Sequence, residues 1–456
     1  MKRFGWHWLV ISSLIAGSLA FAETRPQYGG TLRVAMRAAP SSLDPADSAQ
    51  PDSVARRNLT LLIFETLVTS DENGRVRPGL AVSWQASAGD QRWQFRLRRG
   101  VKFHDGTMLT PEIAAASLRI ANPSWNVSTD ADSVVIERDT ADLGLPAALA
   151  LSRNAIAKRN PGGTLSGTGP FHIADWQPGK KLSLAAEEGY WRGRPFLDMV
   201  EIEMGKNLHD SLIALELGKA DLSEVAPEQS HRVSGDGRRV ADSAPMELVA
   251  LLFTRDTQSP EEKLLREALA LSLDRASMRS VLLQGAGQPA GGILPNWMSG
   301  YGFVFPTQPD LLRARHDREQ ARTAPPWTVG YDASDPMARL LVERVALNAR
   351  DAGLTLQPRT AAGADLQLLR IPLAAPDPWI SLTDVAAIAG LPKPKARGGS
   401  AEDLYSAEQA ILAAQRLIPL FHLPASYAAA TTLKNWSPGR DGSWNLAEAW
   451  LGNEKP

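Results

Sequence analysis

The sequence contains no cysteine among its 456 residues. This absence excludes disulfide bonds, thiol nucleophiles and cysteine-ligated metal sites. It also removes the residue that carries the acyl group of a bacterial lipoprotein. An exported form of this chain is therefore expected to carry no lipid anchor.

Neither charge sign is in excess, since 49 Lys and Arg residues face 50 Asp and Glu residues, for a formal net charge of −1. No global field would attract nucleic acid or anionic lipid, so neither is predicted as a partner. The seven histidines include no close pair at i and i+4, and they stand at positions 7, 104, 172, 209, 231, 316 and 422. No metal site is predicted, although nickel bound by dispersed histidines or through a chelator stays open.

Nucleophile and phosphate motifs are also missing. The chain has no Gly-x-Ser-x-Gly elbow, and the Gly-Thr-Gly-Pro at residues 167–170 lacks the Lys-Ser/Thr of a phosphate loop. We predict no cofactor, no catalytic residue and no enzymatic activity. A secreted hydrolase is the less favoured alternative class.

The first 22 residues have the features of a secretory signal peptide. Lys2 and Arg3 precede an apolar stretch, and Ala20-Phe21-Ala22 supplies small residues where a signal peptidase cleaves. Cleavage is predicted before Glu23, which would release the protein unanchored into a periplasm. A membrane helix is the alternative, but the apolar stretch is short of the roughly 20 residues that a span needs.

The length favours two or three domains. Alternation across residues 76–104 predicts strands, with Trp93, Phe95 and Leu97 on one face and Arg96 on the other. Helices are predicted over residues 57–67, 111–120 and 210–217, and one long helix over residues 259–285. Strand, helix and strand patterns then follow one another from residue 327 to 360, which is typical of an α/β domain with a partly parallel sheet.

The stretch "WQFRLRRGVKFHDGTMLTPE" at residues 93–112 raises a choice between chemistry and scaffold. His104-Asp105 could form a dyad, but no nucleophile accompanies it in the sequence. Asp105-Gly106 is a typical turn pair, and Thr110-Pro111 is a typical helix start. The arginines alternate with apolar residues, as on the solvated face of a strand. The stretch is therefore interpreted as a turn between a strand and a helix.

Several segments in this order resemble the family 5 extracellular solute-binding proteins, the peptide-, oligopeptide- and nickel-type receptors of ABC importers. They are "GGTLRVA", "SLDPA", "IFETLV", "PGLAVSW", the stretch above, "GTGPF" and "REALALSLDRASM". The resemblance covers nearly the whole chain after residue 22. It implies an α/β, two-lobe periplasmic binding protein-like fold of class II type with an inserted β-rich domain.

The resemblance also implies a division of the chain. Lobe I is expected to comprise residues 23–55, 165–247 and 431–456, the inserted domain residues 56–164, and lobe II residues 248–430. A peptide-like or other small solute would bind between the lobes, and the closed monomer would deliver it to the membrane permease of an ABC importer. A degenerate relative that acts as a sensor or protein-binding module is the alternative.

By this resemblance, ligand contacts come from the loop after the first strand and from an acidic segment of lobe II. The candidate ligand-binding residues are Ser41, Ser42, Trp297, Asp377 and Trp379. Turn capping is the alternative for both serines and for Asp377, and core packing for the tryptophans. Ala374 stands where peptide receptors of the family hold an acid for the ligand's α-amine, which puts a free peptide N-terminus in doubt.

Overall fold

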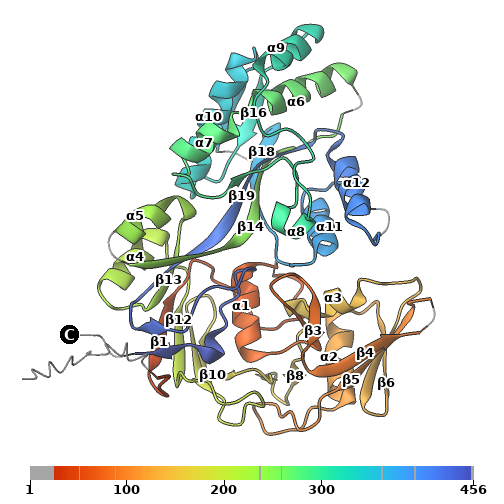
Figure 1. Cartoon of the computed structure of the whole chain (residues 1–456), viewed down its shortest axis with the longest axis vertical. Helices are drawn as coiled ribbons and strands as arrows, with labels where there is room; N and C mark the ends of the chain where they lie inside the picture. The colour runs from red at the N-terminus through yellow and green to blue at the C-terminus, as the bar shows by residue number, and fades with distance from the viewer. Residues whose placement is uncertain are drawn as a thin grey trace, which may run out of the picture.

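The computed structural model describes residues 25–50, 52–87, 89–235, 238–257, 259–360, 363–394 and 397–452. The predicted signal peptide and its cleavage site lie outside these ranges. Within them, no helix is both long and apolar enough to cross a membrane. Two lobes with a side domain make up the α/β fold, and one sheet runs through both lobes (Figure 1).

This sheet has 11 strands, in the order β10-β11-β12-β1-β13-β19-β14-β18-β16-β17, with β15 paired to β19. Its strands are β10 (Phe171–Gln177), β11 (Lys181–Ala186), β12 (Met199–Glu203), β1 (Thr31–Ala35), β13 (Leu222–Val225), β19 (Leu417–Ala429), β14 (Arg239–Phe253), β18 (Leu366–Pro372), β16 (Trp327–Gly330), β17 (Leu356–Arg359) and β15 (Gln288–Pro289). The two long strands β14 and β19 belong to both lobes and so connect them.

Lobe I packs the sheet end β10 to β13 against helix α1 (Val54–Ile63). Leu32 and Val34 of β1 and Leu59 and Ile63 of α1 share one buried core. Since α1 contributes to this core, we propose that the inserted domain begins after α1 and not at residue 56. The other small elements of lobe I are α4 (Leu208–Glu216), η2 (Pro227–Gln229), α5 (Ser230–Gly235), β20 (Leu433–Lys434), η3 (Leu446–Glu448) and β21 (Trp450–Leu451).

The inserted domain has its own four-stranded sheet, in the order β4-β5-β7-β6. Trp93, Phe95 and Leu97 are buried beneath it while Arg96 is exposed, which confirms the predicted alternation. Its elements are β2 (Val68–Ser70), β3 (Val76–Pro78), β4 (Ala81–Ala86), β5 (Arg92–Leu97), α2 (Pro111–Ala121), β6 (Asn126–Asp130), β7 (Ser133–Glu137), α3 (Leu145–Leu149), η1 (Ser152–Asn154), β8 (Lys158–Arg159) and β9 (Leu165–Ser166).

Lobe II covers both faces of its part of the sheet with helices, and each face has its own hydrophobic core. One face carries α6 (Pro260–Ser272), α7 (Arg275–Val281), α9 (Leu311–Gln320) and α10 (Pro336–Asp351). The other carries α8 (Asn296–Ser299), α11 (Pro378–Ile388) and α12 (Ala401–Leu412). Because both faces are covered, the lobe II end of β14, residues 248–253, is apolar on both sides.

The single helix predicted over residues 259–285 is wrong, because α6 and α7 are two helices. Leu273 adopts an extended backbone, with φ −79° and ψ 110°, and ends α6. Asp274 then caps α7 by accepting a hydrogen bond from the backbone N of Ser277. The apolar periodicity continues across the break, which is why the sequence pattern did not reveal it.

The turn at residues 104–107 is confirmed. Gly106 has φ +81°, and the carboxylate of Asp105 accepts a hydrogen bond from the backbone N of Thr107 at 3.1 Å. Thr110 caps α2 as predicted, by accepting from the backbone N of Ile113. The partner of His104 is the backbone of lobe I and not a nucleophilic side chain. Its Nε2 donates to the carbonyl oxygen of Gly169 at 3.0 Å.

Candidate functional site

The carboxyl ends of strands from both lobes point toward one another at the interlobe junction. Residue pairing shows this, because β13 and β18 both run antiparallel to the strands that connect the lobes. β1 is parallel to β13, and β16 is parallel to β18. The loops that follow β1, β13, β16 and β18 therefore meet at the junction. In open α/β sheets this edge is the usual location of ligand sites.

Charged residues gather at these strand ends on the side of α5 and α10. In lobe II, the guanidinium of Arg370 pairs with Glu247 at 2.5 Å and with Asp335 at 2.9 Å. In lobe I, the carboxylate of Glu224 accepts a hydrogen bond from the backbone N of Arg37 at 3.0 Å. Glu228 follows β13 and is close enough for its charge to interact with Arg370 and Asp335 across the junction.

The surroundings shift the pKa values of these groups. It raises the pKa of Glu224, although a backbone hydrogen bond from Arg37 opposes the shift. It also raises the pKa of Glu228, against the attraction of Arg370. Burial alone would lower the pKa of Arg370, but Glu247 and Asp335 raise it above its usual value. The junction therefore contains a fixed cation and partly desolvated carboxyl groups.

Arg57 of α1 connects the lobes on the opposite side of β14 and β19, the hinge strands. Its side chain is buried, and its Nη1 donates to the carbonyl oxygen of Ala374 in lobe II at 2.8 Å. Its Nη2 donates to the carbonyl oxygen of Asp441, and its Nη1 lies 3.5 Å from the carboxylate of that residue. The segment where a family acid was expected is thus bound through its backbone.

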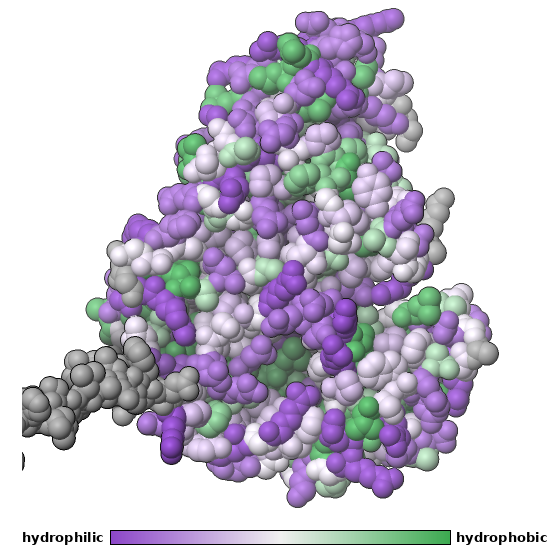
Figure 2. All heavy atoms as spheres, viewed as in Figure 1, coloured by the Kyte–Doolittle hydropathy of each residue, from purple (hydrophilic) through white to green (hydrophobic). Residues whose placement is uncertain are grey.

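Trp297 lies at the same side of the junction. Its indole Nε1 donates to the carbonyl oxygen of Pro245 at 2.9 Å, where β14 has irregular pairing with β19. The guanidinium of Arg440 lies 5.0 Å from the centre of the Trp297 ring. It also contacts Asn73 of the inserted domain. Lobe I, lobe II and the inserted domain therefore meet at Arg440. Figure 2 shows many hydrophilic side chains where the upper lobe meets the lower half of the molecule.

A second three-part contact involves Arg153 of the inserted domain. It pairs with Asp52, which precedes α1, and lies 4.0 Å from the carboxylate of Asp384 on α11 of lobe II. Burial raises the pKa of Asp384, while the cation of Arg153 opposes this. The inserted domain thus takes part in holding the lobes together.

The other predicted site residues have local structural contacts. Asp377 caps α11 by accepting from the backbone N of Ile380 at 3.0 Å and pairs with Arg397 at 2.6 Å. Trp379 is 8% exposed and belongs to a lobe II core. The hydroxyl of Ser41 accepts from Gln50 at 2.6 Å, and that of Ser42 accepts from the backbone N of Asp44 at 3.1 Å. Among the three candidates that belong to lobe II, Trp297 is the one that contacts lobe I, through Pro245 and Arg440.

Sequence reasoning missed the charged residues of the junction. Asp332 of lobe II is one of them, since its charge interacts with that of Arg37 across the junction. Arg37, Glu228 and Asp332 each follow closely after an apolar strand, and this placement is the signal that could have identified them. In the described ranges, no group of three or more His, Asp or Glu residues could hold a metal ion. The arrangement can bind a polar solute by hydrogen bonds and charge.

Similarity to known proteins extends over much of the chain. The family described as bacterial extracellular solute-binding proteins, family 5 middle region, matches residues 75–370. The oligopeptide-binding protein AppA of Bacillus subtilis is 23% identical over 334 residues, which are 65% of this chain and 59% of that protein. The nickel-binding protein NikA of Staphylococcus aureus is 25% identical over 241 residues, which are 50% and 49%. The chain thus spans about half to three fifths of these relatives.

Solved structures show the same fold. NikA from Brucella suis in complex with Fe(III)-EDTA has a TM-score of 0.78 at 17% identity and covers 93% of this chain. AppA from Bacillus subtilis in complex with a nonapeptide has a TM-score of 0.74 at 18% identity and covers 94%. Each of these chains is itself covered completely. The two-lobe α/β fold with an inserted domain therefore matches the expectation from sequence.

Proposed function

Since the chain belongs to family 5 of the bacterial extracellular solute-binding proteins, we propose that it is the substrate-binding receptor of an ABC importer. It captures a small solute between its lobes and presents the closed form to the permease subunits in the inner membrane. The observation that carries the proposal is the meeting of opposed strand ends, where the charge of Glu228 from lobe I interacts with those of Arg370 and Asp335 from lobe II, and the charge of Arg37 with that of Asp332.

Binding by closure explains why charge is distributed over both lobes. A solute that contacts groups of lobe I and lobe II has higher affinity for the closed form, and it shifts the equilibrium by that difference alone. β14 and β19 provide the connection, since their pairing is irregular at residues 242–247. Such irregular positions allow two rigid lobes to rotate.

Localisation in the periplasm follows from the same proposal. Members of the family are extracellular solute-binding proteins, and the start of the sequence has the pattern of a cleavable signal peptide without a lipidation cysteine. A monomer is proposed, because both lobes that form the junction belong to one chain. The solute is a peptide-like or other small polar molecule.

The solute can be identified by native mass spectrometry of protein purified from its own periplasm. A receptor is expected to carry a small mass that dissociates on denaturation. Small-angle X-ray scattering should then show a smaller radius of gyration with that solute than without it. A protein that carries no solute and does not contract with any fraction of the growth medium would contradict the proposal.

A matched pair of variants connects binding to the junction. Glu228→Gln removes a charge at the junction and keeps the shape of the side chain. Glu319→Gln makes the same change on the exposed surface of α9. We expect the first variant to change the affinity for the solute and the second to leave it unchanged, as measured by calorimetry. Equal affinities in both variants and the parent would place the binding site elsewhere.

A further inference from the structure

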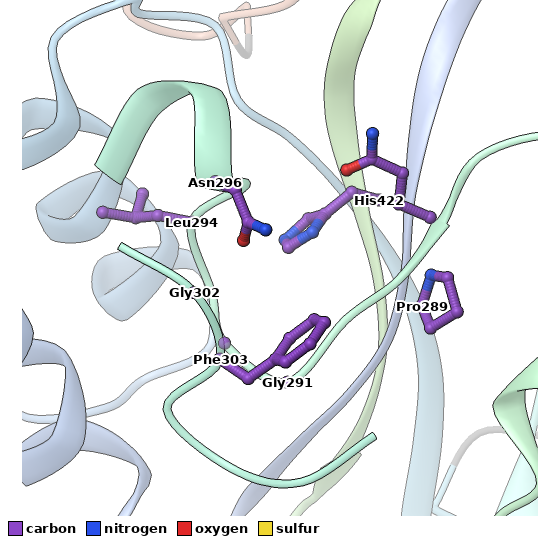
Figure 3. Close-up of a pocket in the computed structure, with 9 residues that line it drawn as sticks. Pro289, Gly291, Leu294, Asn296, Gly302, Phe303 and His422 are labelled. Carbon is purple, nitrogen blue, oxygen red and sulfur yellow. The ribbon is translucent and has the colours of Figure 1, made fainter. Parts of the chain in front are cut away.

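A cavity of about 280 Å³ lies within lobe II, between residues 288–303 and strand β19. Its wall consists of three glycines and six residues with larger side chains, which are Gln288, Pro289, Leu294, Asn296, Phe303 and His422 (Figure 3). None of the charged residues described at the interlobe junction lines it. It is therefore distinct from the proposed transport site.

His422 contributes an unused hydrogen-bond acceptor to this cavity. The residue is 4% exposed, and its Nε2 donates to the carbonyl oxygen of Ile293 at 2.9 Å. Burial lowers its pKa to about 4, so the ring is neutral at physiological pH and its Nδ1 carries a lone pair. Within the described ranges, no hydrogen bond to Nδ1 is formed. In Figure 3 the ring points into the space toward the side chain of Asn296.

The rest of the wall is uncharged. Asn296 supplies an exposed carboxamide, which can donate or accept. The ring of Phe303 is 52% exposed and, with Pro289, offers an apolar surface for a planar group. A water molecule occupies roughly 30 Å³ in the liquid, so the space accommodates a molecule of about ten heavy atoms. A charged ligand would find no countercharge on this wall.

Buried hydrogen bonds hold the cavity wall in place. Glu408 is fully buried, and its Oε1 accepts from the backbone N of Ile293 and from that of Leu294, the latter at 3.0 Å. Tyr301 donates its hydroxyl to the other oxygen of the same carboxylate. A side chain at Gly291 would lie 2.2 Å from the carbonyl oxygen of Phe305. The wall is thus fixed on both sides of Asn296 and needs little reorganisation to bind.

We propose that lobe II carries a second binding site for a small uncharged molecule with a planar apolar part and an N–H or O–H donor, such as an aromatic amide. The donor binds Nδ1 of His422, the amide of Asn296 binds an acceptor of the ligand, and the planar part contacts Phe303. This site is independent of solute capture between the lobes.

Benzamide is a suitable probe, and benzoate is its charged counterpart. Saturation-transfer NMR of the full protein should show binding of benzamide, with benzoate about tenfold weaker because its carboxylate cannot donate to His422. Asn296→Leu, at an exposed position, should weaken benzamide by a similar factor. Binding of benzoate as strong as that of benzamide would overturn the proposed recognition.

Filling the cavity gives the decisive variant. Gly302 lines the space. A β-carbon added to it would have no neighbour within 4 Å, and its φ is not positive. Gly302→Leu is therefore compatible with the fold. Gly399→Leu is the matched control, at another lobe II glycine with open space around it. We expect Gly302→Leu to abolish benzamide binding and the control to retain it. No binding to the parent protein, or unchanged binding to Gly302→Leu, would overturn the proposal, whereas capture of the transported solute would be unaffected in either case.

Discussion

The guanidinium of Arg57 in lobe I donates a hydrogen bond to the carbonyl oxygen of Ala374 in lobe II, at 2.8 Å. The same guanidinium contacts the backbone and the carboxylate of Asp441. Burial would raise the pKa of Asp441, but the attraction of Arg57 and the hydrogen bonds from Ser443 together outweigh it, so the pKa is lowered. One buried side chain therefore joins helix α1, lobe II and the C-terminal segment.

Arg57→Met should lower the free energy of unfolding by about 3 kcal/mol, because it removes the buried guanidinium that binds Ala374 and leaves the carboxylate of Asp441, which is 25% exposed, without its cation. Chemical denaturation monitored by tryptophan fluorescence measures this change. Arg99→Met is the control, since that side chain is 90% exposed and its ion pair at 3.6 Å is on the surface. A loss below ~1 kcal/mol for Arg57→Met would show that the interlobe contact is dispensable.

The alanine at position 374 predicts that the ligand is not selected for a free α-amine. A site without an acid at this position should not select a free α-amine, since an unpaired buried ammonium costs several kcal/mol. Asp377, on the same segment, is already paired with Arg397. Calorimetry with a tripeptide and its N-acetylated form should show that the blocked form binds at least as well. Clear preference for the free amine would mean that another carboxylate of the junction has taken this role.

His104→Ala should affect stability and not solute affinity. The ring bonds to Gly169 through Nε2 and to the backbone N of Gly167 through Nδ1, so it fastens the inserted domain to lobe I. Loss of these bonds should lower the free energy of unfolding by about 1–2 kcal/mol. Solute affinity, measured by calorimetry well below the melting temperature, should stay within about tenfold of the parent. A larger loss without destabilisation would contradict the scaffold role of this turn.

His422 predicts a pH dependence of stability. Its pKa falls from 6.5 when unfolded to about 4 when folded because of burial. The unfolded chain therefore binds more protons between these values, so stability is full above pH 6.5 and is lost as the pH falls toward 4. The loss amounts to about 3 kcal/mol at the acid end. Unfolding curves from pH 7.5 to 4.5 should show this slope in the parent and a reduced slope in His422→Asn; equal slopes would refute the assignment.

The predicted signal peptide can be tested by measuring the intact mass of the protein. Protein purified from the periplasm should begin at Glu23 and carry no acyl group, because Ala20-Phe21-Ala22 precedes that residue and the chain has no cysteine. Intact-mass spectrometry distinguishes this product from the full-length chain. A retained N-terminus would instead support the membrane-helix alternative.

Local patterns in the sequence were sufficient for the strand with Trp93, Phe95 and Leu97 on one face, for the turn at Gly106 and for the cap at Thr110. Each depends on neighbours within a few residues, so periodicity and turn chemistry determine it. The order of several such segments identified the family and, through it, the two-lobe fold. The absence of cysteine by itself excluded disulfides, thiol nucleophiles and cysteine-ligated metals.

The junction was decided by tertiary structure. Arg57 and Ala374 are 317 residues apart, and no local pattern places a buried guanidinium on a distant carbonyl oxygen. Trp379 and Trp297 had similar local surroundings in sequence, yet one is in a core and the other contacts the hinge strand at Pro245. Side-chain burial and long-range pairing depend on how the sheet brings remote segments together. For this reason the sequence indicated where the lobes meet, and the folded chain selected the residues that meet there.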